Sequence, residues 1–251
     1  MNDIIRKGVI LAAGSGKRLG YLSNLLPKTL FPVYDRPIFH HIIDQMEKLK
    51  IKEVYVIVNI HKKKIKEYYK NIKNALKARI HFIEQKNLNG TANAILLTER
   101  YIKNEPFLVF LGDEFVVTDS LKPMVNLFFK TNSIVTEAVI KESNKEILKQ
   151  TCSACLEEDG RISEIIEKPE KPPYNIRGCG IYLFKPEVFN FIRETKINPV
   201  RNVKDITDTI NDISKVKKAY GYLINGYQIN INNSDELLKA NNIIKKFKNK
   251  L

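Results

Sequence analysis

Runs of consecutive apolar residues alternate with amphipathic stretches through the first half of the chain. A short apolar run predicts a strand that is buried on both faces, as in a parallel sheet. Such runs occupy residues 8–13, 54–58, 80–83 and 107–111. Apolar residues at helical spacing predict helices at residues 37–50, 62–74 and 91–101. Strands that alternate with helices in this way indicate an α/β fold with a mostly parallel sheet.

The second half of the chain carries shorter strand-like segments that lie closer together. These segments occupy residues 134–140, 152–157, 161–166 and 180–184. A turn at 157–160 indicates a hairpin, and the proline-rich stretch 168–173 must be a loop. A last helix begins at Ser234, which can cap it. Its apolar stripe comprises Leu237, Ala240, Ile244, Phe247 and Leu251.

These elements predict one Rossmann-like domain, in which a mixed, mostly parallel sheet is flanked by helices. We expect residues 1–251 to form that single domain, with one half in residues 1–115. Residues 116–251, which include the C-terminal helix, would form the other half.

Composition narrows the class of protein. Hydrophobic residues make up 43% of the 251 residues, which excludes a mostly disordered chain. No apolar run reaches the roughly 20 residues of a membrane-spanning helix, and the N-terminus lacks the layout of a signal peptide. Cys152 and Cys155 are three apart on a predicted strand and would point to opposite faces, which disfavours a metal site or a disulfide. We therefore expect a cytoplasmic protein with no membrane partner.

The net charge of +14 raises nucleic-acid binding as one hypothesis. The basic residues are spread over the whole chain, however, and do not gather in one segment. A basic field suits a small polyanionic substrate equally well. We therefore predict that nucleic acid is not the main partner.

A glycine loop, 14–16, directly follows the first predicted strand. Glycines let backbone N–H groups approach phosphate oxygens, and Lys17 and Arg18 add positive charge. The loop does not fit a dinucleotide fingerprint, because Leu19 stands where the third glycine is required. It does not fit a P-loop either. Taken alone, it is equally compatible with an ordinary strand-to-helix turn.

The loop is followed by Pro27-Lys28 and by the stretch 32–37, Pro-Val-Tyr-Asp-Arg-Pro. The whole span 8–37 resembles the signature of the sugar-1-phosphate nucleotidylyltransferases. Within that family it is most similar to the glucose-1-phosphate thymidylyltransferases, with uridylyl- and cytidylyltransferases close behind. The resemblance implies the fold of the nucleotide-diphospho-sugar transferases, with a nucleotide-binding first half and a sugar-phosphate-binding second half.

The resemblance continues to about Leu237 and implies three groups of site residues. Those implied for the nucleotide are Leu11, Ala13, Gly14, Ser15, Gly16, Lys17, Gln85, Gly90 and Thr91. Those implied for the sugar phosphate are Glu167, Lys168, Asn175 and Gly180. The segment 205–208 also matches, in a structural role. Asp113 matches the family residue that holds the catalytic Mg²⁺, and Asn230 stands where a second metal-binding Asp is expected.

The implied reaction is attack of a sugar-1-phosphate oxygen on the α-phosphorus of a nucleoside triphosphate, with release of pyrophosphate. Two anions must meet, so the site must supply positive charge. Arg18 can hold the departing phosphates, and Lys28 can stabilise charge at the α-phosphate. Lys168 can hold the attacking phosphate in line. Asp113 offers the carboxylate oxygen that Mg²⁺ prefers.

Two departures from the family pattern bear on this expectation. Asn230 keeps a carbonyl ligand but lacks the charge of Asp, so metal affinity should fall. Three interpretations are open. Asp113 is the only protein carboxylate on the metal, or Asp235 or Glu236 substitutes for the missing one, or the chain binds nucleotide without turning it over. We favour the first. Cys152 replaces a glycine beside the sugar, and Arg177 adds charge there, so the identity of the sugar is open.

We therefore expect a pyrimidine nucleotidylyltransferase, with dTTP or UTP as donor, glucose 1-phosphate as acceptor and Mg²⁺ as cofactor. The alternatives are a cytidylyltransferase that acts on another sugar or alcohol phosphate, and a non-catalytic nucleotide-binding regulatory protein. The resemblance also suggests a homo-oligomer.

Overall fold

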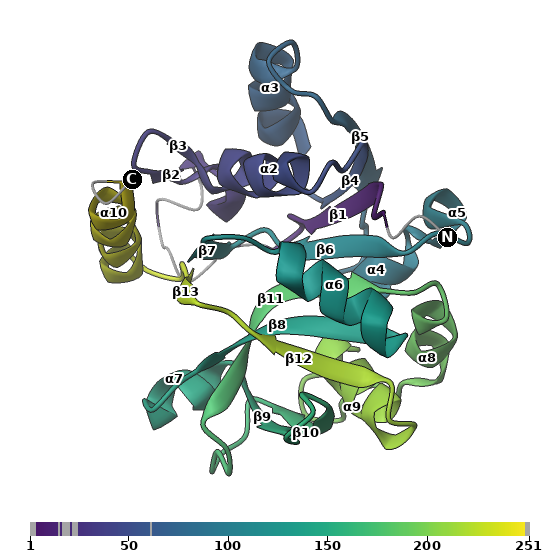
Figure 1. The fold of residues 1–251 in the computed structure, drawn as a ribbon. Helices are drawn as coiled ribbons and strands as arrows, with labels where there is room; N and C mark the ends of the chain where they lie inside the picture. Colours follow the sequence, from purple (N-terminus) through teal and green to yellow (C-terminus); the bar gives the residue numbers. More distant parts are fainter. Residues whose placement is uncertain (1–3, 15, 17–20, 22–24, 61, 249–251) are drawn as a thin grey trace.

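A seven-stranded sheet forms the centre of the molecule (Figure 1). The computed structural model describes residues 4–14, 16, 21, 25–60 and 62–248. The strands in their order across the sheet are β12 (Ala219–Leu223), β8 (Val135–Lys141), β11 (Ile176–Phe184), β6 (Phe107–Leu111), β1 (Lys7–Leu11), β4 (Glu53–Val58) and β5 (Arg79–Glu84). Only β11 runs antiparallel to its neighbours, β6 and β8. The sheet is therefore mixed and mostly parallel, as the sequence predicts.

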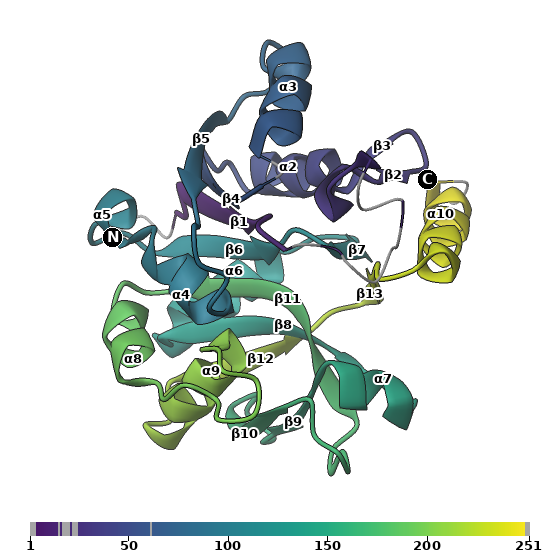
Figure 2. The ribbon, with the colours of Figure 1, turned by 180° about the vertical axis from the view of Figure 1, so that it is seen from behind.

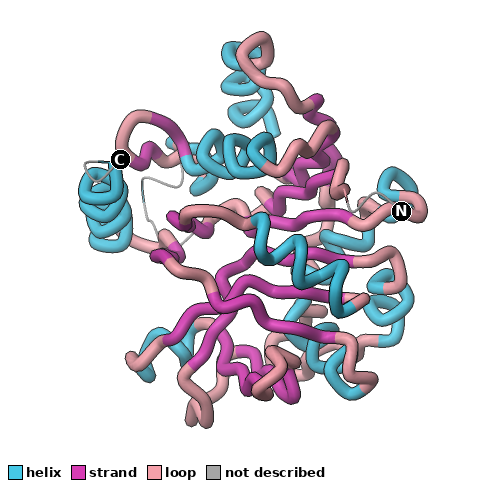
Figure 3. Tube along the Cα trace, in the orientation of Figure 1, coloured by secondary structure: helices cyan, strands magenta, loops and turns pink. Residues whose placement is uncertain are grey.

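Three two-stranded sheets are attached to this framework (Figure 3). They pair β2 (Pro32–Val33) with β3 (Arg36–Pro37), β7 (Glu114–Thr118) with β13 (Gly226–Asn230), and β9 (Cys152–Leu156) with β10 (Ile162–Glu167). The β9–β10 pair is the hairpin that the turn at 157–160 predicts. The β7–β13 pair joins the chain after β6 to the segment before the last helix. This pairing brings Asp113 and Asn230 into the same region.

Helices cover both faces of the central sheet (Figures 1 and 2). One face carries α2 (Ile38–Lys48), α3 (Lys62–Ile72) and α6 (Lys122–Thr131). The opposite face carries α4 (Thr91–Leu96), α5 (Glu99–Ile102), α8 (Val188–Glu194) and α9 (Ile206–Lys215). Two further helices, α7 (Lys145–Gln150) and α10 (Ser234–Lys248), lie at the periphery, with α10 beside β2 and β13.

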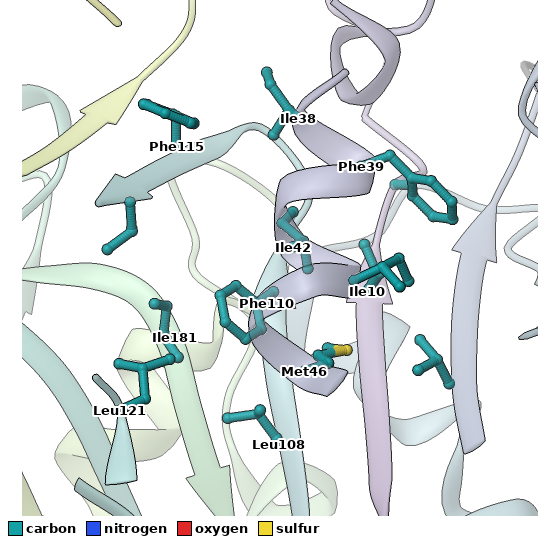
Figure 4. Close-up of a cluster of buried hydrophobic side chains, with 14 of the residues drawn as sticks. Ile10, Ile38, Phe39, Ile42, Met46, Leu108, Phe110, Phe115, Leu121 and Ile181 are labelled. Atoms are coloured by element: carbon teal, nitrogen blue, oxygen red, sulfur yellow. The ribbon is translucent and has the colours of Figure 1, made fainter. Parts of the chain in front are cut away.

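The two faces have separate hydrophobic cores, because alternate side chains of each strand point to opposite sides. On β1, Ile10 packs with Met46 and Ile42 of α2, as Figure 4 shows. Val9, its neighbour, packs in the other core with residues of α4. Strands β1, β4 and β6 are thus buried on both faces, which is why these segments appear as continuous apolar runs.

The predicted segments are found with small shifts, and the structure adds several elements. The segment 91–101, predicted as one helix, forms the two short helices α4 and α5, with Thr98 between them. The strand predicted at 180–184 begins earlier, at Ile176. Ala240 and Ile244 of the predicted C-terminal stripe are buried, and Leu237 is partly buried against the same core. Phe247 falls within the range of α10, but its side chain is not described. Leu251 lies outside the described residues.

The strand order places a crevice at the centre of the sheet. From β1 the chain proceeds outward to β4 and β5, and then returns to form β6 on the other side of β1. The loops that leave the carboxyl ends of β1 and β6 therefore separate. In open α/β sheets this switch point is where ligands bind.

Candidate functional site

A cavity of about 570 Å³ opens at this switch point. It is lined by the loop after β1, the residues after β6, the start of β11, and the segment between β13 and α10. Twelve of the residues predicted for the site line it: Leu11, Ala13, Gly14, Lys28, Gln85, Gly90, Thr91, Asp113, Glu167, Lys168, Gly180 and Asn230. The fold thus gathers residues from the whole length of the chain around one space.

Five other predicted residues are not in this set. Asn175 lines a second, smaller cavity with residues 172–174, so the structure does not bring it to the others. Gly16 is described, with a φ of 66°, but is not among the lining residues. Ser15, Lys17 and Arg18 lie outside the described residues.

Lys28 is the positive charge at the centre of the cavity. It begins a short 3₁₀ helix (Lys28–Leu30) directly after Pro27 and is largely buried. Its Nζ lies 3.3 Å from Asp113 Oδ2 and donates a hydrogen bond to Asn232 Oδ1 at 2.6 Å. Three segments that are far apart in sequence therefore meet at this ammonium group.

Asn230 and Asn232 form a second layer beside these groups. Asn232 Nδ2 donates to Asn230 Oδ1 at 2.6 Å, and Asn230 Nδ2 donates to Glu114 Oε1 at 2.7 Å. Glu236, a suggested substitute ligand, instead accepts the backbone N–H of Asn232 at 2.6 Å and so fixes the start of α10. Its carboxylate supports the asparagine pair by holding their backbone.

The oxygen atoms around Lys28 suit Mg²⁺. A carboxylate of Asp113 and an amide oxygen of Asn232 already converge on one cation, the Lys28 ammonium. Oxygen donors of this kind are what Mg²⁺ takes from a protein, with phosphate oxygens and water as the remaining ligands. No group of three or more His, Cys, Asp or Glu that could hold a metal occurs in the described part of the chain. The oxygen donors of the cavity that fit the ion are those of Asp113 and Asn232, with Asn230 Oδ1 bonded to Asn232 Nδ2 beside them.

A buried polar chain extends from these residues to the outer strands. Arg177 is only 5% exposed; it donates to Gln228 and lies 3.3 Å from Glu142. Gln228 in turn donates to Glu114. Burial raises the pKa of Glu114, and the neighbouring Asp113 carboxylate raises it further, against the effect of Arg177. This series of hydrogen bonds orients the Asn230 amide through its contact with Glu114.

Gln85 and Gly90, both predicted for the nucleotide, line the cavity. Gln85 lies just beyond β5, with its N–H bonded to Val58 O at 2.8 Å and its Nε2 3.4 Å from Gly90 O. Gly90 has a φ of 113°, and a methyl group there would collide with the backbone of Lys204. Only glycine fits this position. The Thr91 hydroxyl accepts the N–H of Ile206 at 2.9 Å, which ties the loop to α9.

Glu167 and Lys168 line the same cavity, at the point where β10 ends. Glu167 Oε2 accepts a hydrogen bond from Thr207 at 2.7 Å, and its Oε1 lies 3.3 Å from both Lys168 Nζ and Arg201 Nη1. The segment 205–208 thus supports Glu167, in agreement with its expected structural role. Lys168 has a φ of 48° directly before a proline, an unfavourable backbone conformation of the kind that clusters at functional sites.

Cys152 lines the cavity where a glycine was expected. Its sulfur accepts the N–H of Gly178 at 3.1 Å, and burial raises the pKa of its thiol. The cysteines at positions 152, 155 and 179 are all free thiols. The pair three apart therefore forms no disulfide, as expected from its position on a strand.

Sequence reasoning missed several residues that line the cavity. Asn232 and Gln228 lie two residues on either side of Asn230 and line the cavity. The family pattern drew attention only to position 230, where an Asp was expected. Glu137 is a single carboxyl in an otherwise apolar strand. That interruption, Val-Thr-Glu-Ala-Val, is a signal that sequence reading could have used, because a charged residue inside a buried strand is rarely without a partner or a function.

Comparison with known proteins places this fold in a family. A family model described as nucleotidyl transferase matches residues 7–246. The chain therefore belongs to the nucleotidyl transferase family. No helix in the described residues is long and apolar enough to cross a membrane.

Particular relatives fall into two groups. The bifunctional protein GlmU of Methanocaldococcus jannaschii is 33% identical over 93% of this chain, but the match covers 53% of that protein. The chain thus spans about half the length of this relative. The UTP–glucose-1-phosphate uridylyltransferase of Staphylococcus haemolyticus is 27% identical, with 88% of this chain and 86% of that protein covered.

The structural comparison points the same way. A crystal structure of UDP-glucose pyrophosphorylase complexed with UDP-glucose superposes with a TM-score of 0.87 at 26% identity. The match covers 97% of this chain and 99% of that one. The sheet order and the cavity therefore belong to a fold that in that relative holds a nucleotide sugar.

Proposed function

We propose that the protein transfers a nucleotidyl group from a pyrimidine nucleoside triphosphate to a sugar 1-phosphate and releases pyrophosphate. The observation that carries this proposal is the meeting of Lys28, Asp113 and Asn232 in one cavity that Gln85, Gly90, Glu167 and Lys168 also line. Family membership and the two enzyme relatives support it. We take UTP or dTTP as donor and a glucose-configured 1-phosphate as acceptor.

The residues of the cavity supply what this reaction needs. Lys28 would stabilise negative charge on the α-phosphate, because its ammonium is already oriented by two oxygen partners. Lys168 would hold the acceptor phosphate in line, and Glu167 would accept hydrogen bonds from sugar hydroxyls. Gln85 would read the edge of the base. Arg18 keeps its proposed role at the β- and γ-phosphates, although it lies outside the described residues.

Asp113 and the asparagine pair would hold Mg²⁺. When bound, the ion neutralises phosphate charge. Glu236 and Arg177 would contribute by fixing the backbone and side chains of this donor set. We infer that a single carboxylate is sufficient, because the Asn232 amide oxygen shares the Lys28 ammonium with it and the Asn230 amide is bonded to Asn232.

The proposed reaction is tested by identifying its product. The protein is incubated with Mg²⁺, glucose 1-phosphate and one triphosphate at a time, and the mixture is analysed by mass spectrometry for the nucleotide sugar. We expect UDP-glucose or dTDP-glucose and an equal amount of pyrophosphate. A product formed only from CTP would favour the cytidylyltransferase alternative, and so would a CDP-alcohol formed when an alcohol phosphate replaces glucose 1-phosphate.

A non-catalytic nucleotide-binding role is the second candidate, and Asn230 is the observation that motivates it. Its amide places no charge beside Asp113. Calorimetric binding of UTP or dTTP without turnover, for every acceptor and metal concentration tested, would favour this role over the enzyme.

A further inference from the structure

Glu137 is a carboxyl group in the middle of the central sheet that the proposed reaction leaves without a role. It lies on β8, opposite Tyr182 of β11 and Gly221 of β12. The residue is 2% exposed, and its Oε2 has no hydrogen-bond partner among the described residues. A buried carboxyl without a partner is costly, so it is retained in a strand only where something compensates it.

The surrounding backbone is shaped to admit this carboxyl group. A methyl group added at Gly178 would overlap Glu137 Oε1, so the missing side chain of Gly178 makes room for it. Glu137, Gly178, Cys152 and Tyr182 all line the same cavity as Lys28 and Lys168. The carboxyl therefore belongs to the wall against which a bound acceptor would lie.

No salt bridge among the described residues includes Glu137. Lys168 and Arg201 lie within 3.3 Å of Glu167. Arg177 is directed to Glu142 and Gln228. Burial and the nearby Glu167 carboxylate raise the pKa of Glu137 to about 8. Glu137 therefore lines the cavity beside Glu167 as a carboxyl group that no cation pairs with among the described residues.

We propose that Glu137 selects the acceptor, and that the preferred acceptor is a sugar 1-phosphate that carries an amino group. This inference rests on the proposed function. The amino group would lie against the Glu137 carboxyl while Lys168 holds the phosphate. An ammonium supplies hydrogen-bond donors together with a positive charge that favours the ionised form of Glu137, whereas a hydroxyl supplies a donor without charge.

The test compares glucose 1-phosphate with its four analogues in which one ring hydroxyl or the 6-hydroxyl is replaced by an amino group. Pyrophosphate release is measured with UTP or dTTP. We expect one analogue to exceed glucose 1-phosphate in kcat/KM by about tenfold or more. Glu137→Gln should remove most of that preference, because an amide keeps the shape but holds no charge. Glu164→Gln, a carboxyl outside the cavity that accepts from Tyr174, should leave the preference intact.

Two results would overturn the inference: no amino analogue surpasses glucose 1-phosphate, or the preference survives Glu137→Gln in a variant that melts cooperatively. Failure of the proposed function is a separate result, in which no sugar phosphate releases pyrophosphate. In that case the same analogues are compared by calorimetric binding. Tighter binding of an amino analogue that depends on Glu137 would still support the inference, and equal binding would refute it.

Discussion

Lys28 links the geometry of the cavity to the proposed chemistry most directly. Its ammonium is held by Asp113 and Asn232 before any ligand binds, so little reorganisation is needed when charge develops at the α-phosphate. We expect Lys28→Met to lower kcat about 10²- to 10³-fold, with a smaller effect on the KM for the triphosphate. Steady-state kinetics provide the measurement.

Lys62→Met is the matched control for this prediction. Lys62 is on α3, where it pairs with Glu84 and does not line the cavity. Equal losses in the two variants, or an unchanged kcat in Lys28→Met, would remove Lys28 from the reaction.

Substitution of Asn230 tests whether this residue contributes a ligand to Mg²⁺. Asn230→Asp adds a negative charge beside Asp113 and should lower the Mg²⁺ concentration needed for half-maximal activity. It also replaces the Nδ2 donor to Glu114 by a second acid, so the free energy of unfolding should fall at neutral pH. A titration of pyrophosphate release against Mg²⁺ measures the first effect. An unchanged Mg²⁺ dependence would place Asn230 outside the metal site.

At this scale, the family resemblance pointed to residues that the fold brings to one cavity, and their roles in phosphate and metal chemistry stay predictions. Asp113 follows an apolar strand, and Lys168 follows Glu167 before a proline-rich loop, so both had a recognisable position. Glu137 and Asn232 had none. Their significance depends on which strands are neighbours, and strand order is a long-range property that local pattern does not contain.

At the scale of elements, the loop before α4 depends on a single glycine. Gly90 has a φ of 113° and lies against the backbone of Lys204, so a side chain there would separate the loop from the segment before α9. We expect Gly90→Ala to lower the free energy of unfolding by about 2 kcal/mol or more. Gly14→Ala is the control, because a methyl group at Gly14 meets nothing within 4 Å. Chemical denaturation that shows equal losses would contradict this account.

The elements that sequence predicted were those with strong periodicity. The buried strands β1, β4 and β6 and helix α2 were placed within a few residues. The helix predicted at 91–101 divides in two because the Thr98 hydroxyl bonds to the backbone carbonyl of Ile95, competing with a continuous helix. Strands β7 and β13 are short and acquire their structure only by pairing with each other.

At the scale of the whole molecule, buried acids make stability depend on pH. The pKa of Glu137 rises from 4.5 to about 8 on folding. The folded state thus retains a proton that the unfolded chain loses above its ordinary pKa, so stability is full below that value and falls as pH rises toward about 8. The slope is about 1.4 kcal/mol per pH unit for one such group.

Glu137→Gln should therefore flatten the stability profile between about pH 5 and 8. Glu114, whose pKa is also raised, would leave part of the slope. Denaturant unfolding at a series of pH values, with Glu164→Gln as control, measures this. A profile as steep as that of the unmodified protein would show that Glu137 is not the buried acid responsible.

The central claim is that the whole fold brings two phosphate compounds together for nucleotidyl transfer. The measurement that tests it most directly is pyrophosphate release for every pair of UTP, dTTP, CTP, GTP and ATP with a panel of sugar 1-phosphates and phosphocholine, all with Mg²⁺. We predict release that requires both partners and is fastest for a pyrimidine triphosphate with a glucose-configured 1-phosphate. Absence of release from every pair, while a nucleotide still raises the melting temperature, would contradict the claim.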